Sequence, residues 1–282
     1  MNPLEGKPSF RGAFPIWGFF AICYGWTWFF WSIPLLFAED VWSYPDVLFI
    51  YLGGIGPPLA GVVMTILMQG RGGLVGLWQR LTDFRRISPG WYLLIFLLVP
   101  SITAVAVGID VFAGSSAQPV DLDPLSDRLT HPLGLLSFVL FVFILGPLPE
   151  EVGWRGYALD RLLERWNALT ASVVLGIAWG VWHTPLFLMK NYYQEFGGEP
   201  PDPIWFLYAI VLNTILITWI YNNTRRSVLA AVLFHFMLNV TGELLPVSSQ
   251  VDRYKTILTT GLVIVVVLWF GPRLLRRRGS MM

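Results

Sequence analysis

The chain alternates long apolar runs with short polar connections. Runs of about 20 residues that are nearly free of charge match the length that a helix needs to cross roughly 30 Å of hydrocarbon. We identify eight such runs and predict a membrane-spanning helix in each. The runs cover approximately residues 14–37, 47–69, 91–113, 132–150, 168–190, 203–221, 228–246 and 256–272. The pattern therefore predicts an all-α fold, a polytopic membrane helix bundle.

The connections between the runs carry turn-forming residues, and none is long enough to hold a separate soluble domain. Examples are Ser43–Pro45, Gly70–Gly73 and Gly197–Pro201, whose Gly, Pro and Ser residues favour turns. We therefore treat residues 1–282 as a single integral membrane domain. The first run is longer than the 7–15 residues typical of a signal-peptide core, so we expect a retained helix.

The composition supports a membrane protein and excludes several other classes. Hydrophobic residues make up 55% of the chain and charged residues only 13%, whereas about a quarter of an ordinary soluble domain is charged. A solvated globular protein, a disordered chain and a fibrous repeat are thereby excluded. The single cysteine, Cys23, lies in an apolar run. It has no partner for an internal disulfide, so we interpret it as a small buried hydrophobic residue.

Basic residues gather on one side of the predicted bundle. If the N-terminus is cytoplasmic, cytoplasmic segments hold 15 of the 19 basic residues, as the positive-inside rule requires. We therefore predict a multi-pass cell-membrane protein with both termini in the cytoplasm. The cytoplasmic set is Lys7, Arg11, Arg71, Arg80, Arg85, Arg86, Arg155, Arg161, Arg165, Arg225, Arg226, Arg273, Arg276, Arg277 and Arg278. The outer connections keep Arg128, Lys190, Arg253 and Lys255, together with the acids Glu39, Asp40, Asp46, Asp121, Asp123 and Asp127.

Few ionisable residues fall within or at the ends of the spans, and such residues are functional candidates because they are costly in a membrane. We expect Asp110, near the outer end of the third span, to reach the interface by snorkelling. Glu243, toward the outer end of the seventh span, is interpreted as mainly structural. His131 lies in an outer connection, and we interpret it as an exposed surface residue.

The remaining polar residues form three short patterns on separate spans. In the first, Glu151 and Arg155 are four residues apart, so they share a helix face and can form an ion pair. Glu150 points about 100° away and stays free for chemistry. Considered alone, this pattern is also what a solvated helix end with two acids and one arginine would show.

The second and third patterns each place a histidine in an apolar run. His183 follows Trp179 by four residues, and His235 precedes Asn239 by four, which puts each pair on one helix face. Packed-core hydrogen bonding would explain either pattern singly. Three polar clusters in a chain otherwise depleted of such groups favour one shared interior site.

Glutamate, two histidines and an asparagine can together hydrolyse an amide. A carboxylate in an apolar pocket can take a proton from water as general base, and histidine can orient that water. An asparagine amide and an imidazole N–H can stabilise the oxyanion that forms. The zinc signature H-E-x-x-H is absent, but Glu150, His183 and His235 could also serve as three zinc ligands, and the spacing leaves that alternative open.

The three patterns resemble the CAAX-protease and bacteriocin-processing (CPBP or ABI) family of intramembrane endopeptidases, which includes the type II CAAX prenyl endopeptidases. That family carries Glu-Glu-x-x-x-Arg, an aromatic-x-x-x-His and His-x-x-x-Asn on successive helices. Here these motifs read Glu150-Glu151-x-x-x-Arg155, Trp179-x-x-x-His183 and His235-x-x-x-Asn239, with Trp179 where phenylalanine is commoner. Residues 135–240 form the predicted catalytic core, and Gly56–Ala60 resembles the family more weakly.

The resemblance implies a role for each matching residue. Glu150 would activate water, with His183 beside the water or the carboxylate, and His235 and Asn239 would form the oxyanion hole. Glu151 and Arg155 would be mainly structural. The resemblance implies a glutamate mechanism without a cofactor, zinc being the alternative, and a membrane-associated peptide or protein as substrate, such as a prenylated CAAX protein or a peptide precursor. The partners would be that substrate and the lipid bilayer, with no nucleic acid.

The expected function is therefore that of an intramembrane endopeptidase whose site lies in a cavity open to the cytoplasm. Two alternatives stay open: a non-catalytic immunity or scaffold protein, and a proton-coupled transporter, which the lack of an inverted repeat disfavours. Counting about 1.5 Å per residue, Glu150 would lie near the inner face and His183 much deeper. They can meet only if the fourth helix continues past residue 150, or if the fifth begins outside the membrane or is tilted.

Overall fold

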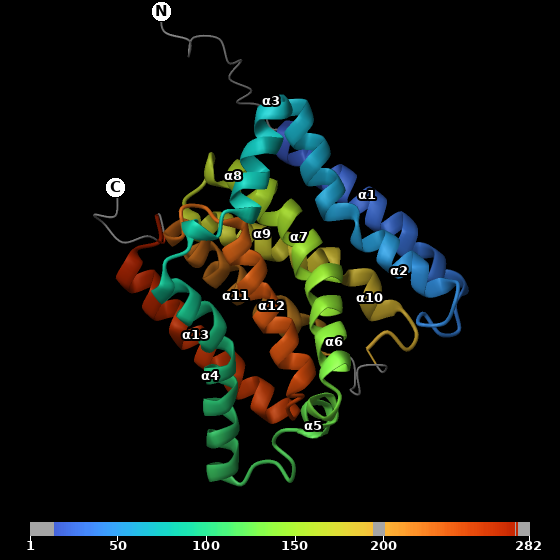
Figure 1. Cartoon of the computed structure of the whole chain (residues 1–282), viewed down its shortest axis with the longest axis vertical. Helices are drawn as coiled ribbons and strands as arrows, with labels where there is room; N and C mark the ends of the chain where they lie inside the picture. The colour runs from blue at the N-terminus through green and yellow to red at the C-terminus, as the bar shows by residue number, and fades with distance from the viewer. Residues whose placement is uncertain (1–13, 194–200, 274, 276–282) are drawn as a thin grey trace, which may run out of the picture.

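A computed structural model describes residues 14–193, 201–273 and 275. The basic residues Lys7, Arg11, Arg276, Arg277 and Arg278, and most of the predicted Gly197–Pro201 turn, lie outside these ranges. The described chain is helical, as predicted, and its regular elements follow in one series (Figure 1). They are α1 (Phe14–Phe37), α2 (Asp46–Gly54), α3 (Gly56–Thr82), η1 (Phe84–Arg86), α4 (Pro89–Ala113), α5 (Asp123–Thr130), α6 (Pro132–Leu145), α7 (Pro147–Gly153), η2 (Trp154–Ala158), α8 (Leu159–Leu163), α9 (Ala168–Trp182), α10 (Thr184–Leu188), α11 (Pro203–Asn223), α12 (Val228–Leu244) and α13 (Ser249–Phe270).

Each of the eight predicted runs is helical. Within the described ranges, seven helices or helix series are long and apolar enough to cross a membrane, and the eighth run, α12, is a shorter apolar helix of 17 residues. Thr224 and Ser227, in the loop before α12, are buried. The Ser227 hydroxyl caps the first turn of α12 by accepting from the amide of Ala230.

The fourth span does not end near residue 150, so the predicted boundary there is wrong. After a break at Gly146, α7 carries the chain past Glu150, and the π-helical η2 and helix α8 continue it to Leu163. The two acids and the arginine marked the end of an apolar run in the sequence. In the structure Glu151 and Arg155 neutralise each other inside the bundle, so the helix can continue. This extension brings Glu150 to the middle of its span.

The second span also differs from its predicted end. The Gly70–Gly73 segment is not a loop, because only Gly70 has a left-handed backbone, with φ of 64°. Gly70 kinks α3, and the helix then continues to Thr82. At the other end of this span, Ser43–Pro45 form the predicted turn before α2.

Close backbone contact joins α3 to α7, the helix that carries Glu150. A Cβ atom at Gly153 would lie 2.3 Å from the carbonyl oxygen of Pro57, and one at Gly61 would lie 2.9 Å from that of Val152. These glycines let the two backbones approach, as small residues do in membrane helix pairs. The Gly56–Ala60 segment thus supports the site-bearing helix.

The loops at each end of the bundle bond to one another. At one end, Trp42 Nε1 donates to the carbonyl of Tyr192 over 3.1 Å, and the amide of Asp121 donates to the carbonyl of Pro246 over 2.8 Å. At the other end, Arg86 Nη1 donates to the carbonyl of Arg225 over 2.8 Å. In Figure 1, α5 and the start of α13 lie at the first end, and α8 lies toward the second.

Three isolated residues test the sequence predictions. Asp110 is completely buried, so the expected snorkelling is wrong; its Oδ1 accepts from the Ser116 hydroxyl over 3.1 Å. That bond replaces the water an interfacial carboxylate would find. His131 is exposed and Cys23 is buried, as predicted.

Candidate active site

One cavity of about 600 Å³ collects the polar residues of all three motifs. Glu150, His183, His235 and Asn239 line it, and they come from α7, the junction between α9 and α10, and α12. The structure therefore brings together the four residues proposed for catalysis, although the motifs lie up to 89 residues apart in the chain. Glu151 and Arg155 are fully buried and lie behind this lining.

Glu150 is held by the indole of Trp179. The Trp179 Nε1–H donates to Oε2 of Glu150 over 2.8 Å, which fixes the carboxylate at the inner end of the cavity. From the sequence, Trp179 is only an aromatic residue in place of phenylalanine, and this bond was not expected. The sequence did contain a signal for this hydrogen bond, because tryptophan carries an N–H donor that phenylalanine lacks.

Glu151 joins Arg155 to His235. Its Oε1 accepts from Arg155 Nη1 over 2.7 Å and from His235 Nδ1 over 3.0 Å. The predicted Glu151–Arg155 ion pair is confirmed, and both side chains have no solvent exposure. The bond to His235 was not expected, and it gives Glu151 a second role in orienting that imidazole. The Arg155 guanidinium also lies 4.8 Å from the centre of the Trp179 ring, a cation–π contact.

His183 is oriented by a carbonyl group. Its Nδ1 lies 2.7 Å from the carbonyl oxygen of Trp179, and since a carbonyl only accepts, Nδ1 carries the hydrogen. This is the hydrogen bond that a packed-core histidine would make. It leaves Nε2 as the nitrogen that can interact with a molecule in the cavity. The rings of Trp182 and Phe206, with centroids 4.7 and 5.3 Å away, hold the imidazole edge-on.

Asn239 lies against the break in the fourth span. A Cβ atom at Gly146 would be 3.3 Å from Nδ2 of Asn239, so the missing side chain at Gly146 leaves room for the amide. Sequence reasoning did not single out Gly146. The role of Gly146 depends on the packing of α12 beside the junction of α6 and α7, which the sequence does not show.

Glu243 also lines the cavity, one turn beyond Asn239 on α12. It was interpreted as mainly structural, yet its carboxylate borders the same space as Glu150. Lys and Arg are missing from the described residues that line the cavity, whereas Glu150, Glu243 and Asp252 are among them. The lining therefore combines acids with aromatic side chains.

The arrangement does not assemble a zinc site from the described residues. Among them, no group of three His, Cys, Asp or Glu side chains comes together as metal ligands. The alternative set of Glu150, His183 and His235 faces one cavity, but the described structure does not gather these three side chains as a ligand set. We therefore derive no step through a metal.

The cavity occupies one half of the bundle. Glu150 and His235 lie near the midpoints of their spans and form its inner end. The other lining residues continue toward the end that carries residues 38–45, 189–193 and the start of α13, where Trp42, Tyr192 and Asp252 border the space. The cavity thus opens on the face opposite the arginine-rich loops, which carry Arg85, Arg86, Arg165, Arg225 and Arg226.

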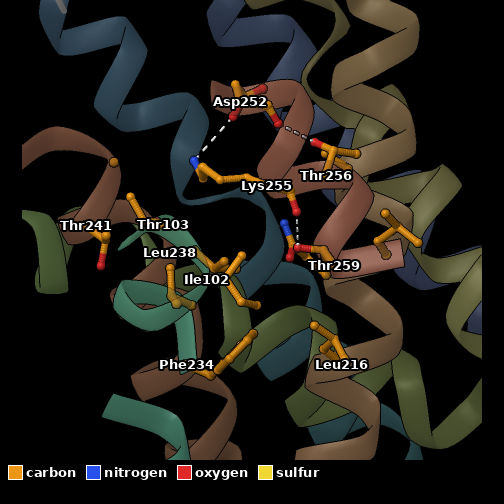
Figure 2. A pocket seen from close by; sticks show the side chains of 15 residues that line it. Ile102, Thr103, Leu216, Phe234, Leu238, Thr241, Asp252, Lys255, Thr256 and Thr259 are labelled. Carbon is orange, nitrogen blue, oxygen red and sulfur yellow. Dashed lines mark hydrogen bonds and ion pairs between the residues drawn. The ribbon is translucent and has the colours of Figure 1, made fainter. Parts of the chain in front are cut away.

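A smaller cavity of about 170 Å³ adjoins the first between α4, α11, α12 and α13. Figure 2 shows it lined by hydroxyl groups and aliphatic side chains, with Asp252 paired to Lys255 over 3.2 Å. Asn213, Leu238 and Asp252 line both cavities. Histidine is missing from the described lining of the smaller cavity, which identifies the larger one as the candidate active site.

Comparison with known proteins covers the segment that carries the three motifs. Residues 132–241, which contain all three motifs, match the model of the family described as type II CAAX prenyl endopeptidase Rce1-like. The segment that carries the motifs is therefore similar to the Rce1-like family. The chain is also 32% identical over 184 residues to CAAX prenyl protease 2 of Methanococcus maripaludis, a match that covers 63% of this chain. The chain is matched to 65% of the length of that relative. The family resemblance predicted from the motifs is confirmed.

The Rce1-like segment does not include the first three spans. It begins at the start of α6 and ends within α12. Several lining residues, among them Trp31, Trp42 and Tyr51, come from α1, α2 and the connection between them. The walls of the cavity are therefore built partly outside the matched segment, whereas the motif residues lie wholly inside it.

Proposed function

We propose that this protein is an intramembrane endopeptidase in which Glu150 activates a water molecule for attack on a peptide carbonyl. One observation carries the proposal: Glu150, His183, His235 and Asn239 line a single cavity, with Glu150 fixed by Trp179. Such a cavity must hold water, because these polar groups cannot be exposed to lipid. The family match and the name of the Methanococcus relative support the same activity.

In the proposed reaction, Glu150 takes a proton from water while the water oxygen bonds to the carbonyl carbon. The carbonyl oxygen becomes an oxyanion, which the amide of Asn239 and the imidazole of His235 stabilise. Collapse of this intermediate breaks the carbon–nitrogen bond, and Glu150 returns the proton to the leaving amine. His183, with its hydrogen on Nδ1, orients the attacking water through Nε2.

The Glu151 contact defines the state in which His235 acts. Nδ1 of His235 donates to the carboxylate of Glu151, so His235 can donate to an oxyanion only from Nε2. That requires a hydrogen on both ring nitrogens. In this imidazolium form His235 makes an ion pair with Glu151, which is also paired with Arg155. Glu151 and Arg155 thus support catalysis without contacting substrate.

The substrate would be a membrane-associated peptide or protein, because the site lies at mid-span within the bundle. The relative's name suggests prenylated CAAX proteins, and other peptide precursors of the membrane are the alternative. The test compares peptides released by membranes of cells producing the wild-type chain or Glu150→Gln. Peptides that accumulate only with the wild type would identify the substrate. Identical peptide profiles, with both proteins inserted at equal levels, would contradict the proposal and favour a non-catalytic scaffold.

A further inference from the structure

The two ends of the bundle differ in charge as well as in access to the cavity. The end without the cavity mouth carries the arginines of residues 71–86, 161–165, 225–226 and 273. The end with the mouth carries the acids Glu39, Asp40, Asp46, Asp121, Asp123 and Asp127, and its described basic residues are Arg128, Lys190, Arg253 and Lys255. Two of these basic residues are paired with acids, Lys190 with Glu39 and Lys255 with Asp252.

Together with the position of the cavity mouth, this charge asymmetry indicates which side of the membrane the active site faces. In loops near a membrane, Lys and Arg are retained on the cytoplasmic side, so the arginine-rich end is the cytoplasmic one. The cavity has lining residues at the other end, including Trp42 and Tyr192 in its loops, and none of the described lining residues lies in an arginine-rich loop. Glu150 is therefore reached from the acidic face.

We infer that the active-site cavity opens to the non-cytoplasmic side of the membrane, and that the substrate is a peptide segment of a membrane-anchored or translocated chain exposed on that side. The inference rests on the proposed function for its substrate class, but its geometry does not depend on catalysis. It replaces the cytoplasmic opening expected from the sequence. A prenylated tail that remains in the cytoplasm would not reach Glu150 by this route.

The charge of the lining agrees with such a substrate. The described lining residues include Glu243 and Asp252 but neither Lys nor Arg. A cleft bordered by charges of one sign attracts the opposite sign. A free C-terminal carboxylate, as at the end of a CAAX sequence, would find no lysine or arginine among these described lining residues. An internal peptide segment that is neutral or basic suits the cavity better.

Cysteine labelling on the full chain tests the orientation. Cys23→Ala removes the only cysteine, and single cysteines are then added as Ser43→Cys, Ser126→Cys or Ser88→Cys. All three serines are exposed; Ser43 and Ser126 lie at the cavity end, and Ser88 lies at the arginine-rich end. A charged, membrane-impermeant maleimide is applied to spheroplasts and, separately, to lysed cells. We expect Ser43→Cys and Ser126→Cys to react in both preparations, and Ser88→Cys only after lysis.

A fourth variant examines the cavity itself. Tyr51→Cys places the thiol in the lining on α2, and we expect it to react in spheroplasts, more slowly than Ser43→Cys. Labelling of Ser88→Cys but not Ser43→Cys in spheroplasts would overturn the inference. That outcome would leave the proposed hydrolysis intact, because labelling needs no activity. Conversely, an inactive protein with the expected labelling would contradict only the proposed function; Glu150→Gln in the same background should label identically.

Discussion

The indole Nε1–H of Trp179 donates a hydrogen bond to Oε2 of Glu150 over 2.8 Å. The same residue accepts from Nδ1 of His183 through its carbonyl oxygen over 2.7 Å, and its ring packs against that of His235 with centroids 4.9 Å apart. One residue of α9 therefore positions the proposed base and contacts both histidines. Its replacement by phenylalanine removes the N–H but keeps an aromatic ring.

We expect Trp179→Phe to lower kcat by on the order of 10- to 100-fold with little change in KM. A hydrogen bond to a charged group contributes about 1.5–3 kcal/mol, and each 1.36 kcal/mol changes a rate about tenfold. Trp205→Phe is the matched control, because Trp205 lines the same cavity and its indole nitrogen has no hydrogen-bond partner among the described residues. Equal kcat values for the two variants would contradict a positioning role for Trp179.

Arg155→Ala should reduce the yield of folded protein. It would leave the buried Glu151 with His235 alone as its partner, and breaking a buried pair from one side costs about 3–5 kcal/mol. Size-exclusion chromatography and thermal unfolding in detergent measure the effect. A stable, monodisperse Arg155→Ala protein would show that the pair is not needed for folding.

The double variant Glu151→Gln with Arg155→Met separates folding from catalysis. Both charges are removed together, so we expect the folded yield to recover toward that of the wild type. Activity should remain low, because a neutral amide at position 151 would no longer pair with the imidazolium form of His235. Peptide cleavage at the wild-type rate by this double variant would count against the proposed link from Glu151 to the oxyanion hole.

Gly153→Ala should destabilise the protein by about 1–3 kcal/mol, the usual cost of overpacking. The new Cβ atom would lie 2.3 Å from the backbone oxygen of Pro57, so α3 and α7 would have to separate. Gly25→Ala in α1 is the control, because its Cβ atom would meet nothing within 4 Å. Thermal unfolding in detergent should show a lower midpoint only for Gly153→Ala; equal midpoints would disprove the close contact.

Cleavage by the purified enzyme should survive exhaustive chelation. The expectation follows from the side chains, since the described residues do not bring three metal ligands together. Metal analysis of the same active sample is the control. Loss of cleavage on chelation, with recovery on adding zinc, would replace the glutamate mechanism with metal-assisted hydrolysis.

The sequence predicted the helices and the Glu151–Arg155 pair well, because both depend on local signals. Long apolar runs define the spans, and a spacing of four residues placed Glu151 beside Arg155. The end of the fourth span was wrong because charge near residue 150 was interpreted as the membrane boundary, whereas the charges of Glu151 and Arg155 cancel inside the bundle. Asp110 was misplaced for a related reason, since Ser116 supplies its hydrogen bond within the protein.

Contacts between spans could not be predicted from one sequence. The bond from Trp179 to Glu150 and the bond from His235 to Glu151 each join residues of different helices, and no periodic pattern records such pairs. The direction in which the cavity opens could not be predicted for the same reason. It depends on which ends of several separate spans border the space, although the charge asymmetry that assigns the sides was visible from the start.

The most direct measurement of the proposed mechanism compares two glutamate-to-glutamine substitutions in one cavity. Glu150 and Glu243 both line it, and each substitution removes a carboxylate with little change in volume. With purified full-length protein and a membrane peptide identified from the wild type, we expect Glu150→Gln to abolish cleavage and Glu243→Gln to retain it. Cleavage at the wild-type rate by a well-folded Glu150→Gln protein would contradict the assignment of Glu150 as the base.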